Sequence, residues 1–339
     1  MAAVAASIEG DAPRGVDAPG RGCPLDYRYP PGALRDAPSL EADVLWVVGG
    51  LYGNLEALRA IAARVDAERA DRVEVVLNGD YHWFDADPAR FAAIEAGVAG
   101  WRAMRGNVET ELARPGDALE AGCGCAYPDS VAQEDVDRSN AMIARLRDTA
   151  RSIGVAAALG DLPMLRRARV GELRVGLVHG DDRALAGWRL AHDALEASRA
   201  DGLDAAFDAA DVDLIACSHT CLPVADTFAS RADGRPLGVI NNGAAGMANF
   251  AGTTHGIATR IAAPGTPVPD GLPVLYRATL HGADVAAVAI DFDLERFLAA
   301  FDATWPRGSA GERSYRRRIV AGTAYSPAAA IRGAFRAVR

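Results

Sequence analysis

The sequence predicts an α/β protein in which parallel or mixed β-sheets are covered by helices. Short apolar runs typical of buried strands alternate with amphipathic stretches of helical spacing, and each strand-like run ends in Gly with Asp, Asn or His. Of the 339 residues, 50% are hydrophobic and 24% are charged, which is the composition of a globular protein. Because single cores stop growing near roughly 250 to 300 residues, we expect one core with extensions.

The first strand–loop–helix unit follows an N-terminal extension. Residues 1–42 are rich in Ala, Gly, Pro and Asp and show no sustained period. DVLWVVGG, residues 43–50, is a short apolar run that ends in two glycines, which indicates a buried strand. Asn54 is expected to cap the helix that follows this strand. We therefore expect the main domain to begin at residue 43.

The same unit then repeats along the first half of the chain. RVEVVLNGD, residues 72–80, predicts a buried strand, and the next helix is expected to open near Pro88. WRAMRGNVE, residues 101–109, predicts a third strand that runs into a Gly-Asn turn. An amphipathic helix is expected over residues 134–154.

The second half carries more strand than the first. Residues 164–181 predict two strands around a Gly-Glu turn, two helical stretches follow at about 188–209, and VDLIACSHT predicts a strand at 212–220. Four further strands and a helix are expected at residues 237–243, 256–261, 274–280, 285–292 and 294–305. We expect a domain over residues 43–304 and a C-terminal tail over 305–339.

Charge and hydropathy exclude several classes of function. The net charge of −9 and the isoelectric point near 5.2 argue against a nucleic-acid partner, because phosphate backbones are bound by clustered Lys and Arg. No run approaches the roughly 18 to 20 apolar residues of a membrane span, and the first residues lack the basic start of a secretory signal. The expected location is therefore cytoplasmic. The sequence does not indicate the oligomeric state.

The polar residues at the strand ends are the informative feature. In open α/β sheets the loops at the carboxyl ends of strands meet at one edge, where ligands bind. Five such loops are expected to gather four side chains: Asp80, Asn107, His179 and His219. Two imidazoles, a carboxylate and an amide oxygen suit Zn²⁺, Mn²⁺ or Fe²⁺. The alternative is a hydrogen-bonded polar cluster that only holds the loops.

The order and spacing of these loops resemble the calcineurin-like metallophosphoesterases, in particular their small phosphodiesterase branch. That branch carries the motifs GDxHGN, GD, GN[HD], H and GHTH, which GGLYGNLEAL, NGD, RGNVE, LVHGD and SHT resemble here, with INNGAAG as the following loop. The resemblance covers about residues 44–260. It implies a four-layer α/β/β/α sandwich of two mixed β-sheets flanked by helices.

The first motif departs from the family pattern. The resemblance implies one metal bound by four residues that are all present: Asp80, Asn107, His179 and His219. The ligands of the other metal are replaced by Gly50, Tyr52 and Cys221, and the histidine of the third motif is Val108. We therefore expect a divalent transition metal, Zn, Mn or Fe, as one ion, or as two if the second site has been rebuilt.

Neighbouring residues are candidates for what the first motif lacks. His82 is a candidate replacement ligand or general acid, and Cys221 is a candidate soft ligand that joins the metal set. Tyr52 is a candidate hydrogen-bond donor to an oxyanion. Glu109, in the third loop, completes the candidate catalytic residues.

The predicted function is that of a metal-dependent phosphoesterase. It would hydrolyse a small phosphorylated metabolite or nucleotide through a metal-activated water, with that substrate as its partner. One alternative is a non-catalytic or repurposed protein of the same fold that binds a ligand or a partner. Another is a different chemistry on this scaffold, with metal ligation by Cys221 and Cys125. The SYRRRI segment of the tail is a candidate lid over the pocket.

Overall fold

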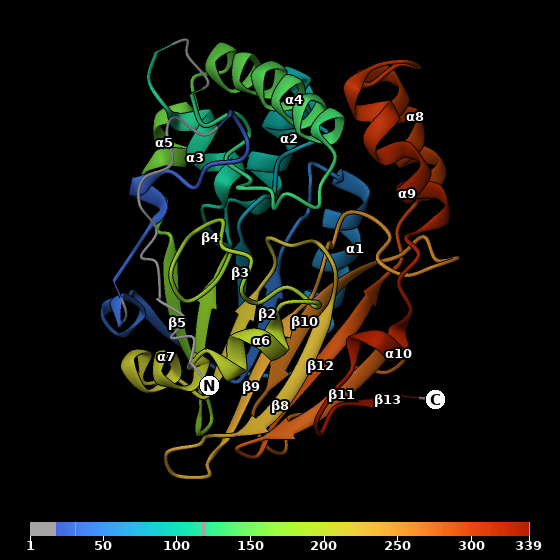
Figure 1. Ribbon diagram of the computed structural model, residues 1–339. Coiled ribbons are helices and arrows are strands. Elements are labelled where there is room, and N and C mark those ends of the chain that lie inside the picture. The colour runs from blue at the N-terminus through green and yellow to red at the C-terminus, as the bar shows by residue number, and fades with distance from the viewer. Residues whose placement is uncertain (1–17, 31, 117–119, 339) are drawn as a thin grey trace, which may run out of the picture.

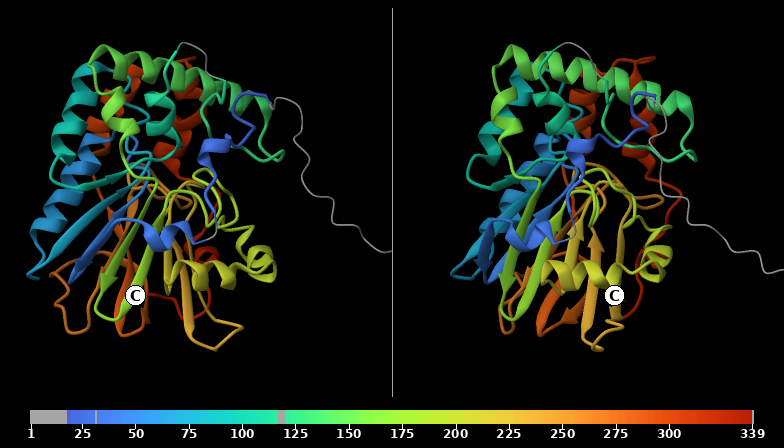
Figure 2. Two further views of the ribbon diagram at one scale, coloured as in Figure 1. Left: turned by 90° about the vertical axis from the view of Figure 1, so that its left-hand side faces the viewer. Right: turned by 60° about the vertical axis from the view of Figure 1, so that its left-hand side comes forward.

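The computed structural model describes residues 18–30, 32–116 and 120–338 (Figure 1). Among these residues the main strands form two sheets that pack face to face, and helices cover the outer face of each sheet. Seen from the side, the sheets lie between the helices of the first half and helices α6 and α7, Leu195–Ala200 and Leu203–Ala210 (Figure 2). The four-layer α/β/β/α sandwich of two mixed sheets is confirmed.

The first sheet has seven described strands in the order β13-β11-β12-β10-β2-β3-β4. Strands β2, β3 and β4 are parallel, and the others join antiparallel. Their bounds are β2 Val44–Val48, β3 Val73–Asn78, β4 Arg102–Met104, β10 Gly256–Ala262, β11 Val274–Leu280, β12 Ala283–Ile290 and β13 Arg336–Ala337. The C-terminal residues therefore supply an edge strand to this sheet.

The second sheet has six described strands in the order β1-β5-β6-β7-β9-β8. Their bounds are β1 Ser39–Ala42, β5 Leu165–Val170, β6 Leu173–Val178, β7 Leu214–Cys217, β8 Val224–Ala229 and β9 Pro236–Asn241. Strand β1 lies within the predicted N-terminal extension and pairs in parallel with β5. The division of the chain at residues 42 and 304 stays a prediction, although segments on both sides of it join the sheets.

The alternation of side chains along β2 shows how the layers are held together. Trp46 packs with the helices on the outer face, whereas Leu45 and Val47 pack between the two sheets. All three are fully buried, as expected for a strand covered on both faces. The helices on this side are α1 Leu55–Asp66, α2 Pro88–Val98, α3 Asn107–Ala113, α4 Gln133–Ser152, α5 Ala156–Gly160 and α8 Leu294–Thr304.

Most predicted elements are confirmed at their expected positions, including the helix cap. The side chain of Asn54 accepts hydrogen bonds from the first backbone N–H groups of α1. The expected third strand, 101–109, ends at Met104, because α3 begins at Asn107 directly after Gly106. The helices expected from about 188 begin only at Leu195, because the preceding residues form turns.

The C-terminal segment, residues 305–338, follows α8 back over the body. It contains a short π-helix at Glu312–Arg316, helix α9 at Arg317–Ala321 and helix α10 at Pro327–Ala330. Helix α9 lies below α8 in the view of Figure 1. The indole of Trp305 donates to the backbone oxygen of Phe84 over 2.9 Å, which fixes the start of the segment against the loop after β3.

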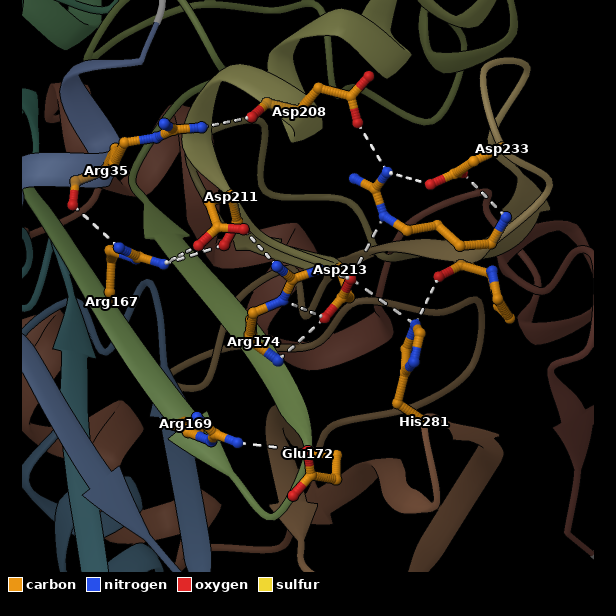
Figure 3. Close-up of polar contacts among 12 residues, drawn as sticks. Arg35, Arg167, Arg169, Glu172, Arg174, Asp208, Asp211, Asp213, Asp233 and His281 are labelled. Atoms are coloured by element: carbon orange, nitrogen blue, oxygen red, sulfur yellow. Dashed lines mark hydrogen bonds and ion pairs between the residues drawn. The ribbon is translucent and has the colours of Figure 1, made fainter.

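A polar cluster ties the two sheets together at the edge where β6 and β7 begin (Figure 3). The Arg174 guanidinium donates to both carboxylate oxygens of Asp213, over 2.9 and 2.6 Å. His281, in the turn between β11 and β12, lies 3.7 Å from the same carboxylate and donates to the backbone oxygen of Pro236 over 2.8 Å. The loops expected to bind a ligand lie at the opposite ends of these strands. None of the described helices has the length and apolar character of a membrane span.

Candidate metal centre

Four loops at the carboxyl ends of β3, β4, β6 and β7 bring the predicted metal ligands together. His179 Nε2 lies 3.1 Å from Asn107 Oδ1, 3.3 Å from Asp80 Oδ2 and 3.2 Å from His219 Nδ1. One ligand atom from each of Asp80, His179 and His219 lies within 4.8 Å of the others. We call these four buried residues the ligand cluster.

Each histidine has an outer ring nitrogen, which faces away from the ligand cluster, and an inner one, which faces into it. The hydrogen bond of the outer nitrogen determines whether the inner nitrogen carries a proton or a free lone pair. His179 Nδ1 donates to the backbone oxygen of Asn78 over 2.8 Å, and His219 Nε2 donates to the backbone oxygen of Cys125 over 3.0 Å. A carbonyl oxygen only accepts, so the proton of each neutral ring sits on the outer nitrogen. The two nitrogens that face each other therefore both present lone pairs. Such carbonyl contacts also orient metal-binding histidines.

The amide of Asn107 is oriented in the same way. Its Nδ2 donates to the backbone oxygen of Cys123 over 2.9 Å, which turns Oδ1 toward His179. When both imidazoles are neutral, two ring nitrogens, an amide oxygen and a carboxylate oxygen converge with no hydrogen between them. Four converging lone pairs repel one another unless a cation lies between them. This N/O donor set fits Zn²⁺, Mn²⁺ or Fe²⁺.

The electrostatics of the cluster also favour positive charge. Although burial opposes its charging, the Asp80 carboxylate raises the pKa of His179. Burial, together with the neighbouring His179, lowers the pKa of His219 to about 4. Burial acts to raise the pKa of Asp80, but His179 outweighs it and lowers that pKa. The cluster is therefore built around an ionised carboxylate that favours positive charge beside it, carried by His179 or by a bound metal ion.

Two glycines allow the loops to approach one another this closely. A Cβ at Gly79, whose φ is +78°, would lie 2.5 Å from His179 Nδ1. A Cβ at Gly106 would lie 2.3 Å from Asp80 Oδ1. Real Cβ atoms do not approach other atoms this closely, so both positions require glycine.

Glu109 lies behind the ligand cluster. Its carboxylate accepts hydrogen bonds from the backbone N–H groups of Asp80 over 2.8 Å, Tyr81 over 3.0 Å and Gly106 over 2.8 Å. Burial and the nearby Asp80 raise its pKa to about 7. Glu109 was expected among the catalytic residues, but the structure uses it to clamp two ligand-bearing loops together. Its side chain does not line the cavity.

Tyr52 and Cys221 lie side by side on another wall of the cavity. The Tyr52 hydroxyl is 2.6 Å from Cys221 Sγ, and both residues have positive φ, +56° and +59°. A Cβ at Gly50 would lie 2.9 Å from the Tyr52 ring. Tyr52 therefore occupies the space into which a ligand at position 50 would project. The structure does not bring Cys221 into the ligand cluster.

His82 points away from the ligand cluster. Its Nδ1 lies 2.6 Å from Asp85 Oδ2, its Nε2 lies 2.7 Å from Glu95 Oε1, and its ring stacks on Phe91 with centroids 3.6 Å apart. Burial opposes the charge of this ring, but the Asp85 and Glu95 carboxylates raise its pKa to about 9. The left-handed turn at Asp80, with φ of +52°, directs the following residues into the helical layer. The structure therefore does not place His82 as a ligand or as an acid facing the cavity.

The cavity above the ligand cluster has a volume of about 170 Å³. Besides Tyr52, four aromatic side chains line it: Trp83, Tyr127, Trp188 and Tyr315. Arg318, from the same C-terminal segment as Tyr315, also lines it. Sequence reasoning missed Tyr127 and Trp188, because no motif or period marks them. It raised the tail only as a candidate lid, and in the structure that tail forms a wall.

Comparisons with known proteins bear on the fold. No family model matches the chain, and no curated protein matches it in sequence. The solved structure of hypothetical protein PH1004 from Pyrococcus horikoshii OT3 matches 83% of this chain and 99% of its own, with 12% identity and a TM-score of 0.55. A metallophosphoesterase from Sphaerobacter thermophilus matches 83% of this chain and 100% of its own, with 18% identity and a TM-score of 0.48.

At these identities the likeness concerns the fold alone. The two mixed sheets, the outer helices and the order of the loops at the strand ends agree with what the sequence resemblance implied. The chain has the calcineurin-like metallophosphoesterase fold.

Proposed function

We propose that this chain is a metal-dependent phosphoesterase that hydrolyses a small phosphorylated metabolite or nucleotide. The observation that supports the proposal best is the ligand cluster, in which four lone-pair atoms converge beneath a cavity. A divalent Zn, Mn or Fe ion is the cation that such a donor set selects. One ion is proposed, because Tyr52 fills the space beside Gly50.

A metal held by the ligand cluster would lower the pKa of a bound water and polarise a phosphoryl oxygen. The chain's own residues prepare the site for this chemistry. Asp80 supplies the negative charge, while the carbonyl contacts of His179 and His219 fix the direction of their lone pairs. Glu109 holds the loops that carry Asp80 and Asn107.

A second candidate function is ligand binding without hydrolysis. Two observations favour it. Tyr52 and Cys221 are in contact at the wall where the family carries further metal ligands. Val108 replaces the third-motif histidine, which the resemblance implies helps to protonate the leaving group. Both features remove parts that a two-metal phosphoesterase uses to stabilise the attacking and leaving oxygens. An activity assay of the wild-type protein distinguishes the two candidates, because only the phosphoesterase would turn over substrate.

The test combines elemental analysis with a hydrolysis assay on the same preparation. The full chain is purified without added metal, its Zn, Mn and Fe content is measured, and p-nitrophenyl phosphate and bis(p-nitrophenyl) phosphate are offered as substrates. We expect about one equivalent of metal and measurable hydrolysis. His179→Ala should lose both the metal and the activity, because it removes the atom at the centre of the cluster.

His192→Ala is the matched control. This histidine lies outside the cavity and packs against Tyr325, with ring centroids 4.7 Å apart. It should keep the metal content and the activity of the wild type. Hydrolysis by a His179→Ala variant that carries no metal would contradict the proposal, and a metal-loaded wild type without turnover would favour the binding function.

A further inference from the structure

Arg318 is the one cationic side chain among the described residues that line the cavity. It projects from α9, and two neutral backbone carbonyls hold it in place. Its Nε donates to the backbone oxygen of Ala248 over 2.8 Å, and its Nη2 donates to the backbone oxygen of Cys221 over 2.7 Å. Nη2 also lies 3.4 Å from Asn249 Oδ1. Its guanidinium therefore has a defined position on the wall that carries Cys221.

Within the described part of the chain, no carboxylate lies within ion-pair distance of Arg318. Its neighbour Arg316, by contrast, donates to both carboxylate oxygens of Asp302, over 2.8 and 3.0 Å. Nη1 of Arg318 likewise has no hydrogen-bond partner among the described residues. A half-buried guanidinium without a counter-ion, held at a cavity, is prepared to bind an anion from that cavity, because its planar donors match carboxylate and phosphate oxygens.

The size of the cavity limits what that anion is. Pockets for drug-sized ligands occupy roughly 300 to 1,000 Å³, whereas this cavity has about 170 Å³. It therefore has room for a compact anionic group with part of a substituent. Thr220, on the same wall, accepts from Asn241 Nδ2 over 2.8 Å, which leaves its own hydroxyl proton to donate elsewhere.

We infer that Arg318 binds the phosphoryl group of the substrate and favours phosphomonoesters. The choice of phosphate as the anion rests on the proposed function. A phosphomonoester carries about −1.5 to −2 charges at neutral pH, so it gains from a cation on each side, the metal position and Arg318. The carbonyl that anchors Arg318 belongs to Cys221, one of the residues that replaces a family metal ligand. Arg318 thus supplies positive charge to the wall that has lost a metal position.

The test measures binding of inorganic phosphate to the metal-loaded full chain by isothermal titration calorimetry. Arg318→Ala should weaken phosphate binding by about 10- to 100-fold, the range for hydrogen bonds to charged groups, with the metal content unchanged. Arg317→Ala is the matched control, because Arg317 is the adjacent arginine and is exposed. Its affinity for phosphate should equal that of the wild type. The KM of Arg318→Ala for p-nitrophenyl phosphate should rise more than that for bis(p-nitrophenyl) phosphate.

A second variant keeps the test decisive if Arg318→Ala does not fold. Arg318→Gln retains a donor for the anchoring carbonyls but carries no charge, and it should show the same loss of phosphate affinity. A folded, metal-loaded Arg318→Ala or Arg318→Gln variant that binds phosphate like the wild type would overturn the inference, as would a metal-loaded wild type that binds none. Phosphate binding through Arg318 without any turnover would leave the inference standing and refute the proposed hydrolysis instead.

Discussion

The hydroxyl of Tyr52 lies 2.6 Å from the sulfur of Cys221, at the wall of the cavity beside the ligand cluster. Burial raises the pKa of both groups, so at neutral pH the pair is a phenol and a thiol. The thiolate is the form in which cysteine binds metals. This contact therefore closes the wall with two neutral groups and favours a single metal coordinated by nitrogen and oxygen.

Cobalt substitution tests the coordination of that metal. Because the ligand cluster offers only nitrogen and oxygen, the Co²⁺-loaded chain should lack the charge-transfer absorption of a cobalt–thiolate bond. Cys221→Ser should leave the visible spectrum unchanged, whereas His219→Ala should alter it. A thiolate band that disappears in Cys221→Ser would instead establish cysteine ligation and the alternative chemistry.

Gly50 and Tyr52 should be energetically coupled. Gly50 has φ of +57°, and a Cβ there would lie 2.9 Å from the Tyr52 ring. Gly50→Ala should therefore destabilise the fold by about 1 to 3 kcal/mol through backbone strain and overlap with the ring. In the Tyr52→Ala background the overlap is gone, and the same substitution should destabilise less, with a coupling energy of about 0.5 to 3 kcal/mol.

Urea unfolding of the four members of this double-mutant cycle measures the coupling. Gly100→Ala is the control, because a Cβ at Gly100 meets no atom within 4 Å and the residue does not have positive φ. That substitution should be neutral or slightly stabilising. Equal destabilisation by Gly50→Ala in both backgrounds would show that Tyr52 does not occupy the space beside Gly50.

Glu109 should matter for metal retention although it does not face the cavity. Its carboxylate accepts hydrogen bonds from backbone groups of both the Asp80 loop and the Asn107 loop. Glu109→Gln replaces one acceptor oxygen with a donor that faces these N–H groups. We expect a loss of about 2 to 3 kcal/mol in the free energy of unfolding and weaker metal binding.

Glu74→Gln provides the matched control for this substitution. Glu74 pairs with Arg102 over 3.3 Å at the surface, with 28% of its side chain exposed. An exposed pair of this kind contributes at most about 1 kcal/mol. Urea unfolding and metal content are measured on both variants. The comparison separates the loss of a surface carboxylate from the loss of the contacts that hold the two loops together. Wild-type metal content in a folded Glu109→Gln variant would refute the clamp that we assign to Glu109.

Much of the ligand cluster was predictable because the signal is local. Asp80 and Asn107 follow the neighbouring parallel strands β3 and β4 of one sheet, so the carboxyl ends of these strands bring them to one edge. His179 and His219 follow the neighbouring parallel strands β6 and β7 of the other sheet and share its edge in the same way. The helix cap at Asn54 was predictable for the same reason, and the apolar runs predicted most of the strands. The edge strand β8 was missed, because Asp226 and Thr227 interrupt the apolar residues of its sequence VADTFA.

The direction of side chains beyond the strand ends was not predictable. His82 is two residues from Asp80, yet the positive φ at Asp80 sends it toward Asp85 and Glu95. Arg318 reaches the cavity from a segment about 100 residues beyond His219, through contacts with Ala248 and Cys221. Such placements depend on long-range packing, which no period or motif in the sequence records.

The ion cluster at the opposite edge of the sheets predicts a pH-dependent contribution to stability. Although burial opposes ionisation, hydrogen bonds from Arg174 lower the pKa of Asp213. A carboxyl group whose pKa is lower in the folded state stabilises the fold above its unfolded pKa of about 3.9. That contribution is lost as the pH falls through the lower folded value.

Asp213→Asn should therefore destabilise the fold at neutral pH by about 2 kcal/mol, the scale of hydrogen bonds to a charged group. The difference in unfolding free energy from the wild type should shrink below about pH 4, where the Asp213 carboxylate becomes protonated.

Asp208→Asn is the control, because Asp208 is 43% exposed and pairs with Arg235 at the surface. It should change stability by less than about 1 kcal/mol at every pH. Metal content should stay that of the wild type in both variants, because the ligand cluster lies at the other ends of β6 and β7. Urea unfolding from pH 3 to 8 measures these differences, and a gap between Asp213→Asn and the wild type that widens toward pH 3 would contradict the assigned ion pair.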